Sequence, residues 1–340
     1  MVLVYLAGCF LHWRTVAWIN ISFVLLPLVL MYLFSPESPT WLVSRGRNED
    51  ALKACKIVSM DKGKDIVHQR RVRLLEREHE RNAIKPSTSQ ISKIFSVLRE
   101  PTVYKPFCIL TMCFFFQQMS GIYIFIFYTV EFFKKIDGGG VDSYLMSVVV
   151  ALIRMFVGFI TSQLLYKFGR RILCLSSLTS MAVIMFISGS VALFVNLHYL
   201  EREWLKVPIF GILLYICMST MGLLSVPWTM TAEMYPMHVR GVMQGMSVCI
   251  AHVIMFGVIK SYYTLLAWLG GVAGLLLFYS AVCVVGLVFL YVFLPETHNK
   301  TLEEIADYFA HNSVYITRRK SLYDDRFPVK TVDDTENGHV

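Results

Sequence analysis

Charge is scarce in this sequence. Asp, Glu, Lys and Arg make up 16% of the 340 residues, whereas hydrophobic residues make up 56%. A typical soluble domain carries about a quarter charged residues, so the composition excludes an ordinary water-soluble protein and favours a membrane protein. The net charge of +8 does not indicate a nucleic-acid partner, because the basic residues concentrate in loops beside apolar segments. Their positions fit the enrichment of Lys and Arg in the cytoplasmic loops of membrane proteins.

The sequence also lacks the patterns of a metal site or an enzyme. Its eight cysteines stand singly, mostly within apolar segments, and no C-x-x-C pair or His/Cys cluster accompanies them. They indicate packing residues, and neither a disulfide framework nor a zinc site. No nucleophile constellation and no phosphate-binding loop is recognisable either. We therefore expect no enzymatic activity, no metal and no cofactor.

Long apolar runs are what the sequence has in abundance. A helix that crosses a bilayer needs about 20 mostly apolar residues. Such spans are predicted near residues 15–34, 105–133, 143–166, 172–195, 207–232, 241–265 and 269–294. A shorter apolar stretch at 1–12 has neither the basic region nor the cleavage site of a signal peptide, so we interpret it as the end of a further helix.

The spans divide the chain into four predicted parts. Hydrophobicity falls between residues 35 and 101, where alternating charges and sparse apolar residues predict short amphipathic helices at the membrane surface. This loop holds the largest excess of Lys and Arg, which places it in the cytoplasm. Alternation of the spans then places the C-terminus there too. The parts are an apolar leading part at 1–34, the cytoplasmic loop at 35–101, a six-helix membrane part at 102–294 and a cytoplasmic tail at 295–340.

Pro-Glu follows a membrane-length stretch twice, in "SPESPTWL" at 35–42 and in "LPETHNKTLEEI" at 294–305. Many transporters are built from two related halves. Six predicted spans lie between the loop at 35–101 and Pro295, but only one span and the 1–12 stretch precede Pro36. We therefore expect that Pro-Glu closes each half, and that about four helices of the first half are missing.

Five motifs together carry a family resemblance. They are "PESPTWL" (36–42), "QQMSGIYIFIFYT" (117–129), "GRR" (169–171), "VPWTMTAEMYPMHVRG" (226–241) and "PETHNKTLEEI" (295–305). Each is weak alone, but all five in this order at the ends of predicted spans resemble the sugar porters of the major facilitator superfamily. Within that superfamily the sequence is similar to the insect facilitated trehalose transporters and the animal glucose facilitators.

The resemblance implies both a fold and a function. The fold is all-α and transmembrane, with the C-terminal six-helix half of a major facilitator protein and about one and a half helices of the N-terminal half. Residues 1–34 would then hold the remnant of the family's helix 5 and its helix 6. The implied function is facilitative transport of trehalose or a hexose by alternating access. We expect a multi-pass protein of the plasma membrane, with an intracellular membrane as the alternative.

Two glutamines interrupt an otherwise apolar predicted helix. Inside a bilayer the amides of Gln117 and Gln118 need a partner or a wet cavity, and they offer donors and acceptors that suit sugar hydroxyls. Hydrogen bonding between packed helices is the alternative. The resemblance implies sugar contact for both residues. It also places Trp228 beside the substrate, where the indole face can lie against a sugar ring.

Gly121, Gly222 and Pro227 are the predicted points of helix flexibility. A proline inside a spanning helix removes a backbone hydrogen bond and bends the helix, which permits gating if neighbouring groups satisfy the freed carbonyl. An ordinary kink followed by an interfacial Trp is the alternative.

A set of charged residues is predicted at the cytoplasmic ends of the helices: Glu37, Arg170, Arg171, Glu233 and Arg240. Arginine can pair bidentately with carboxylates. Such pairs would hold one alternating-access state closed and break as the two halves rock. For Arg170 and Arg171, plain positive-inside anchoring is the alternative.

The sequence departs from the glucose facilitators at three places in the expected cavity, and a fourth departure is the Tyr166-Lys167 region, where an acidic residue is usual before Gly169. Tyr123 and Arg154 each stand where those proteins have Asn, and Ala251-His252 stands where an Asn-Trp pair is usual. A mid-membrane Arg costs at least ~2.5–3.5 kcal/mol, so we expect Arg154 to face the substrate or an interhelical partner, with snorkelling as the alternative. Tyr123 and Arg154 therefore join the predicted substrate-binding residues, and the changes argue against glucose specificity.

Three functions remain open at this point. The first is a facilitative sugar carrier, whose partners are a small sugar and the lipid bilayer. The second is a non-transporting fragment or truncated isoform that pairs with a full-length carrier, since one half supplies one wall of the substrate cavity. The third is a sugar sensor, which is less well supported because the tail at 295–340 carries no recognisable signalling pattern.

Overall fold

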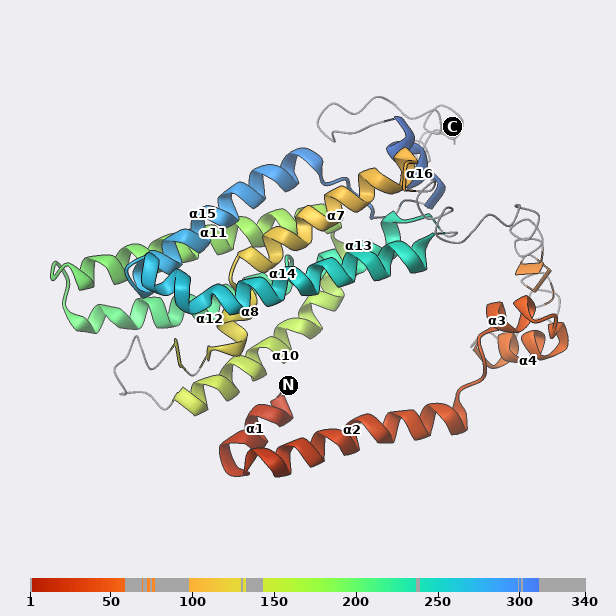
Figure 1. Cartoon of the computed structure of the whole chain (residues 1–340), viewed down its shortest axis with the longest axis horizontal. Helices are drawn as coiled ribbons and strands as arrows, with labels where there is room; N and C mark the ends of the chain where they lie inside the picture. The colour runs from red at the N-terminus through yellow and green to blue at the C-terminus, as the bar shows by residue number, and fades with distance from the viewer. Residues whose placement is uncertain are drawn as a thin grey trace, which may run out of the picture. The chain divides into compact units, whose positions relative to one another are not determined.

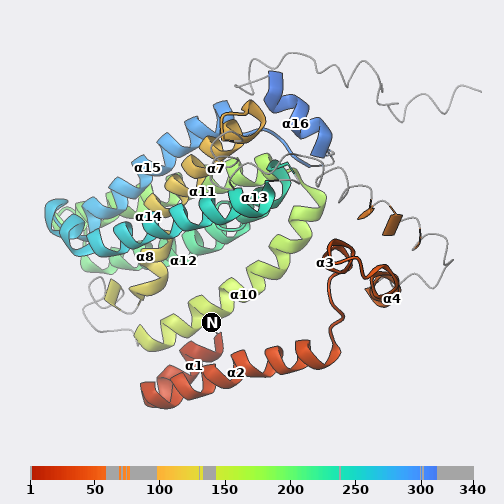
Figure 2. The same cartoon turned by 45° about the vertical axis from the view of Figure 1, so that its right-hand side comes forward.

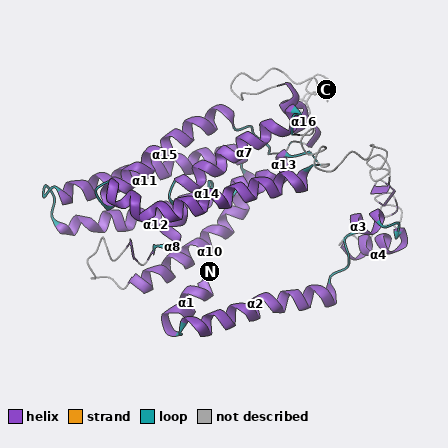
Figure 3. Cartoon of the chain, in the orientation of Figure 1, coloured by secondary structure: helices purple, strands orange, loops and turns teal. Residues whose placement is uncertain are grey.

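The computed structural model describes residues 2–58, 98–129, 131–132, 143–236, 239–298, 300 and 302–311, together with residues 69, 72, 73, 75 and 76. Within these residues every regular element is a helix (Figure 3), which confirms the predicted all-α class. The predictions for most of 59–97 and for the tail beyond residue 311 lie outside the described residues. The chain divides into two units, one of residues 1–9 and 96–340 and the other of residues 10–95.

The first unit is a bundle of long helices. It contains α1 (Val2–Phe10), α7 (Pro101–Met119), α8 (Ile122–Phe127), α10 (Ser143–Lys167), α11 (Arg170–Asn196), the 3-10 turn η1 (Arg202–Leu205), α12 (Lys206–Met221), α13 (Val226–Met234), α14 (Arg240–Trp268), α15 (Val272–Phe293) and α16 (Leu302–His311). Figures 1 and 2 show α11 lying along α15 and α12, and α14 lying along α7. Long helices suit a bilayer because each one satisfies its own backbone hydrogen bonds.

Aromatic side chains fix the short helix α8 in the core of this bundle. Phe125 of α8 is fully buried and meets Tyr215 of α12 and Tyr279 of α15 edge-on, with ring centroids 5.3 and 5.8 Å apart. Phe132 also packs edge-on against the Phe125 ring, with the ring centroids 5.1 Å apart. Edge-to-face pairs at such distances add roughly 0.5–1.5 kcal/mol each beyond area burial. The position of α8 is therefore set by rings from two other helices.

Six helices in the described part of the chain are long and apolar enough to cross a membrane by length and composition. They are Trp13–Phe34, Leu145–Lys167, Arg170–Asn196, Arg202–Met234, Arg240–Trp268 and Val272–Phe293. Each overlaps one of the predicted spans. The predicted span at 105–133 corresponds to α7 and α8.

Two of the predicted spans are broken, which the apolar pattern did not show. α7 ends at Met119 and α8 begins at Ile122, and between them Gly121 adopts φ +85°. A second break separates α12 from α13 at residues 222–225, immediately before Pro227. Glycine tolerates the left-handed conformation, and proline cannot donate to the preceding turn. Both breaks therefore have a local chemical cause.

The second unit carries α2 (Trp13–Phe34), α3 (Pro39–Ser44) and α4 (Asn48–Val58). No residue of α2 is buried within the structure, although the helix is almost wholly apolar. The two short helices pack on one another through a small apolar cluster of Leu42, Val43, Ala51, Ala54 and Cys55. On the surface of α4, the Arg47 guanidinium beside Asp50 holds the pKa of that carboxyl below its usual value.

One helix was not anticipated from the sequence. α16 lies inside the segment interpreted as a tail, and it packs against α7. Ile305, Tyr308 and Phe309 are buried on one face of α16. At its C-terminal end the Lys105 ammonium donates a hydrogen bond of 2.8 Å to the carbonyl of Phe309, which is a favourable place for a cation.

Candidate functional site

Gln117 of α7 holds the break between α12 and α13. Its side chain is fully buried, and Nε2 donates to the carbonyls of Leu223 and Leu224 at 2.7 and 3.0 Å. Pro227 has no N–H, so the Leu223 carbonyl has lost the donor that a regular helix would provide four residues on. The Gln117 amide replaces that donor from a neighbouring helix.

The acceptor ends of the two glutamines are not satisfied in the way that the donor end of Gln117 is. Gln117 Oε1 and Gln118 Oε1 are both buried and have no hydrogen-bond partner within the described structure. An unsatisfied buried acceptor costs roughly 1–3 kcal/mol. Two such atoms on adjacent residues would favour any ligand that brings hydroxyl donors to them.

Arg154 lies on the packed face of α10, on the same side as the buried residues Ser147, Ala151 and Thr161. The phenol groups of Tyr5 on α1 and Tyr123 on α8 lie close enough to interact electrostatically with its guanidinium. Arg154 therefore belongs to the same polar neighbourhood as Tyr5 and Tyr123. Tyr5 is itself anchored to α8, since its hydroxyl donates to the carbonyl of Ile126 at 2.9 Å.

Trp228 connects the second break to this cluster. Its indole lies near the Tyr123 side chain, and because an indole N–H can only donate, the Tyr123 oxygen is the group that could accept from it. The ring of Trp228 meets Phe114 of α7 edge-on at 5.0 Å and His252 of α14 at 5.9 Å. His252 is exposed, and its Nδ1 contacts the carbonyl of Val248 at 2.7 Å.

The two predicted glycines occupy places where a side chain would collide. A Cβ on Gly121 would lie 2.7 Å from the ring of Tyr279, which is almost fully buried. A Cβ on Gly222 would lie 2.3 Å from the carbonyl oxygen of Leu173 on α11. Both breaks therefore depend on glycine for close approach, and the first also depends on it for its left-handed backbone conformation.

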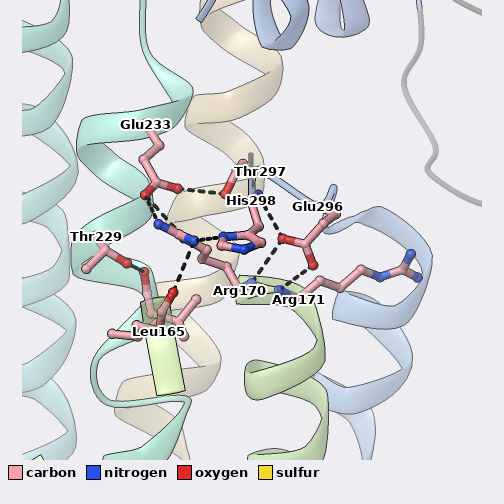
Figure 4. A network of polar contacts seen from close by, with 9 residues as sticks. Leu165, Arg170, Arg171, Thr229, Glu233, Glu296, Thr297 and His298 are labelled. Atoms are coloured by element: carbon pink, nitrogen blue, oxygen red, sulfur yellow. Dashed lines mark hydrogen bonds and ion pairs between the residues drawn. The ribbon is translucent and has the colours of Figure 1, made fainter. Parts of the chain in front are cut away.

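A second polar cluster gathers around the beginning of α11 (Figure 4), and we call it the arginine network: Arg170, Arg171, Glu233, Glu296, Thr297 and His298. Arg170 lies between α13 and the segment after α15. Its Nε and Nη2 donate to Glu233 Oε1 at 3.2 and 3.0 Å, and Nη1 contacts Nδ1 of His298. The other carboxylate oxygen of Glu233, Oε2, accepts a hydrogen bond of 2.7 Å from the Thr297 hydroxyl.

Glu296 caps the N-terminus of α11. The backbone N–H groups of Arg170 and Arg171 donate to its two carboxylate oxygens at 3.0 and 3.2 Å. A carboxylate is favoured there because the first N–H groups of a helix have no partner within it. The approach depends on Gly169, since a Cβ at that position would lie 2.2 Å from Glu296 Oε2.

The structure brings only part of the predicted charged set together. Arg170 and Glu233 form an ion pair, whereas Arg171 reaches Tyr291, whose carbonyl accepts from Nη2 and whose ring lies under the guanidinium. Arg240 donates to the carbonyl of Tyr235 at 3.3 Å. Glu37 belongs to the other unit and pairs with Arg47 at 3.5 Å.

Sequence reasoning missed several polar residues that hold these clusters. Tyr215 donates to the carbonyl of Ser120 at 2.6 Å, and Ser177 accepts from the backbone N–H of Leu223 at 3.2 Å. Glu296 and His298 were read only as part of an exit motif. One signal could have placed Glu296 against α11. Its carboxylate follows the end of one span, and the Gly-Arg-Arg motif comes just before another, so the two could meet at the same end of the bundle.

Comparison with known proteins decides the family. A family model described as "Sugar (and other) transporter" matches residues 5–309 of the chain. The chain belongs to the sugar transporter family. Facilitated trehalose transporter Tret1 of Drosophila pseudoobscura pseudoobscura is 31% identical over 308 residues, which cover 90% of this chain and 34% of that protein. Tret1 of Polypedilum vanderplanki is 30% identical over 306 residues, which cover 88% of this chain and 58% of that protein.

Solved structures show the same fold for this family member. The major facilitator proton:xylose symporter XylE bound to 6-bromo-6-deoxy-D-glucose aligns with a TM-score of 0.64 at 24% identity, over 83% of this chain and 56% of that one. An inward open conformation of XylE from E. coli aligns with a TM-score of 0.63 at 21% identity, over 89% and 61%. The chain thus spans between about a third and three-fifths of the length of these proteins.

Proposed function

We propose that this sugar transporter family member acts in facilitative transport of a sugar across a membrane by alternating access. The observation that carries the proposal is the position of its polar groups. Buried amide oxygens of Gln117 and Gln118 lie beside one helix break, and Trp228 follows the other, in spans that are otherwise apolar. Membrane carriers commonly bind their substrates where spanning helices are discontinuous.

The ligand chemistry follows from the acceptors. A sugar brings several hydroxyl donors in a fixed geometry, and donation to Gln117 Oε1 and Gln118 Oε1 would recover the cost of their burial. The half-buried Trp228 ring offers an apolar face for the C–H side of a sugar ring. Trehalose or a hexose is the proposed substrate, and trehalose is favoured because the relatives named above are trehalose transporters.

Arg154 and Tyr123 are the proposed determinants of which sugar is accepted. Their charge and phenol group interact with one another within the cluster that also contains Trp228. A guanidinium held there offers donors to sugar oxygens in a place where the glucose facilitators carry an uncharged Asn. This difference supports a substrate preference other than glucose.

The arginine network is the proposed gate. Arg170 joins α11 to α13 through Glu233 and to the segment after α15 through His298, so the three segments are held together by charge-assisted contacts. Alternating access requires such contacts to break and reform as helices move. We place this end of the bundle, the loop at 35–101 and the C-terminus in the cytoplasm, and the protein in the plasma membrane.

Uptake in cells tests the proposal. The chain is expressed with verified membrane insertion, and uptake of labelled trehalose and glucose is measured with and without excess unlabelled sugar. Saturable uptake that is lost in a Gln118→Leu variant with equal insertion is the expected result. Insertion without saturable uptake of either sugar contradicts it.

Co-expression addresses the second interpretation. Because the chain spans 34% of one relative and 58% of another, the same uptake assay is run with a full-length trehalose transporter present. Under the proposal the carrier's own uptake is unchanged or adds to that of the chain. A reduction of the carrier's uptake at equal carrier abundance supports a non-transporting partner of a full-length carrier and contradicts the proposal.

A further inference from the structure

The two helix breaks are each closed by a side chain from the other broken helix. Gln117, one turn before the first break, donates to the carbonyls of Leu223 and Leu224 in the second break. Tyr215, two turns before the second break, donates to the carbonyl of Ser120 in the first. Both donors are completely buried. The contacts therefore run in opposite directions between the same two discontinuous spans.

Further groups tie each break to its neighbours. In the second break, Ser177 of α11 accepts from the Leu223 N–H at 3.2 Å and donates to the Met218 carbonyl at 2.7 Å. In the first break, the Ser120 hydroxyl donates to the carbonyl of Gln117 at 2.8 Å. Buried backbone groups need such partners, because leaving one unsatisfied costs more than a hydrogen bond gains.

From this arrangement we infer that Tyr215 and Gln117 are reciprocal positioning residues, which make the two breaks rearrange together and not one at a time. Opening the second break removes the acceptors of Gln117 and frees the residue that precedes the first break. Opening the first break removes the acceptor of Tyr215 and frees the helix that leads to the second. Tyr215 need not touch a ligand to act in this way.

The coupling has a consequence for the site, which rests on the proposed function. Gln117 and Gln118 precede the first break, Tyr123 follows it, and Trp228 follows the second. A pair of breaks that move together keeps these groups in one geometry in each state. A ligand that binds Gln117 Oε1 would then act on α13 through the Nε2 of the same amide.

Hydrogen exchange of the purified, sugar-free chain tests the coupling without relying on transport. Exchange is followed in peptides covering residues 117–126 and 219–229, in the wild type and in Tyr215→Phe, Gln117→Leu and Ser177→Ala. Loss of one buried hydrogen bond raises local opening by about threefold to tenfold. We expect each variant to raise exchange in both segments.

Tyr235→Phe is the matched control. The hydroxyl of Tyr235 is buried and contacts Ser247 Oγ at 2.6 Å, away from both breaks, so its removal should leave the two segments unchanged. If Tyr215→Phe raises exchange only in 117–126 and Gln117→Leu only in 219–229, the breaks are independent and the inference is wrong. If Tyr215→Phe does not fold, Gln117→Leu and Ser177→Ala decide the same question, since each must loosen the first break as well as the second.

Discussion

The side-chain nitrogen of Gln117 lies 2.7 Å from the carbonyl oxygen of Leu223, the group that Pro227 leaves without a backbone donor. A single amide thus repairs a discontinuous helix with its donor end and keeps its acceptor end buried and unpaired. Of the two interpretations considered from the sequence, contact between helices describes the donor end of Gln117, and contact with a ligand is what we propose for its acceptor end.

The relationship predicts a coupling between Gln117 and Pro227. Gln117→Leu should lower the free energy of unfolding by roughly 1–3 kcal/mol, because a buried carbonyl loses its donor. In a Pro227→Ala background the restored N–H of residue 227 can serve Leu223, so the same substitution should cost less. Thermal unfolding of the four proteins of this cycle measures the difference. Strictly additive costs would show that Gln117 does not replace the missing donor.

Gly121→Ala should destabilise the bundle around α8. The left-handed conformation costs a non-glycine residue about 1–2 kcal/mol, and the new Cβ would lie 2.7 Å from the ring of Tyr279. Gly257→Ala in α14 is the control, since a Cβ there meets nothing within 4 Å. Differential scanning fluorimetry of the two variants should show a lower unfolding temperature for Gly121→Ala alone. Equal temperatures would mean that α8 accommodates the methyl group by moving.

Substitutions at Glu296 should separate the charge of the carboxylate from its role as a cap. Glu296→Gln keeps an acceptor for the first N–H groups of α11 but removes the charge, with an expected cost of about 0.3–1 kcal/mol. Glu296→Ala removes both and should cost about 0.5–2 kcal/mol. Unfolding measurements on the purified variants should show a larger loss of stability for Glu296→Ala than for Glu296→Gln, and the reverse order would contradict the capping role.

Gly169→Ala should act through Glu296. Its Cβ would lie 2.2 Å from Glu296 Oε2 and displace the carboxylate, so the variant should lose about as much stability as Glu296→Ala. The double variant should lose little more than either single one, because both remove the same contact. A double variant whose cost equals the sum of the two would contradict this account of the glycine.

Arg154 should determine sugar preference. Arg154→Gln removes the charge beside Tyr123 while keeping a side chain that can hydrogen-bond, so the ratio of trehalose to glucose uptake should shift by several-fold. Arg202→Gln, at the exposed turn η1, is the control for removal of a positive charge. An unchanged ratio in an Arg154→Gln protein that folds and inserts normally would remove Arg154 from the substrate site.

Long apolar runs were enough to predict where the helices lie, and Gly121, Gly222 and Pro227 were predicted points of flexibility, but the sequence did not show that the helices are interrupted there. A glycine in an apolar run is compatible with a continuous helix, and so is a proline that only kinks it. The breaks at Gly121 and before Pro227 are stabilised by Gln117, Ser177 and Tyr215, which come from other helices. Such partners cannot be assigned from spacing along one segment.

For the charged residues, too, the sequence predicted their positions along the chain but not their partners. Arg170 and Glu233 were predicted from the sequence as charges at helix ends. That Arg170 Nη2 lies 3.0 Å from Glu233 Oε1 depends on how the helices pack, which the sequence did not show. Glu296 was interpreted as the mark of a helix exit, although its carboxylate also caps α11. α16 was overlooked because it has only ten residues, yet the spacing of Ile305, Tyr308 and Phe309 is helical.

The most direct measurement is equilibrium binding of labelled trehalose and glucose to the purified 340-residue chain. Wild type is compared with Gln118→Leu, and with Tyr235→Phe as a buried substitution outside the site. The account predicts saturable binding of at least one sugar, retained in Tyr235→Phe and weakened about tenfold or more in Gln118→Leu, which corresponds to loss of one buried hydrogen bond to the ligand. Equal binding by all three proteins, or none by a folded wild type, would contradict the claim that the buried amides beside the helix breaks receive a sugar.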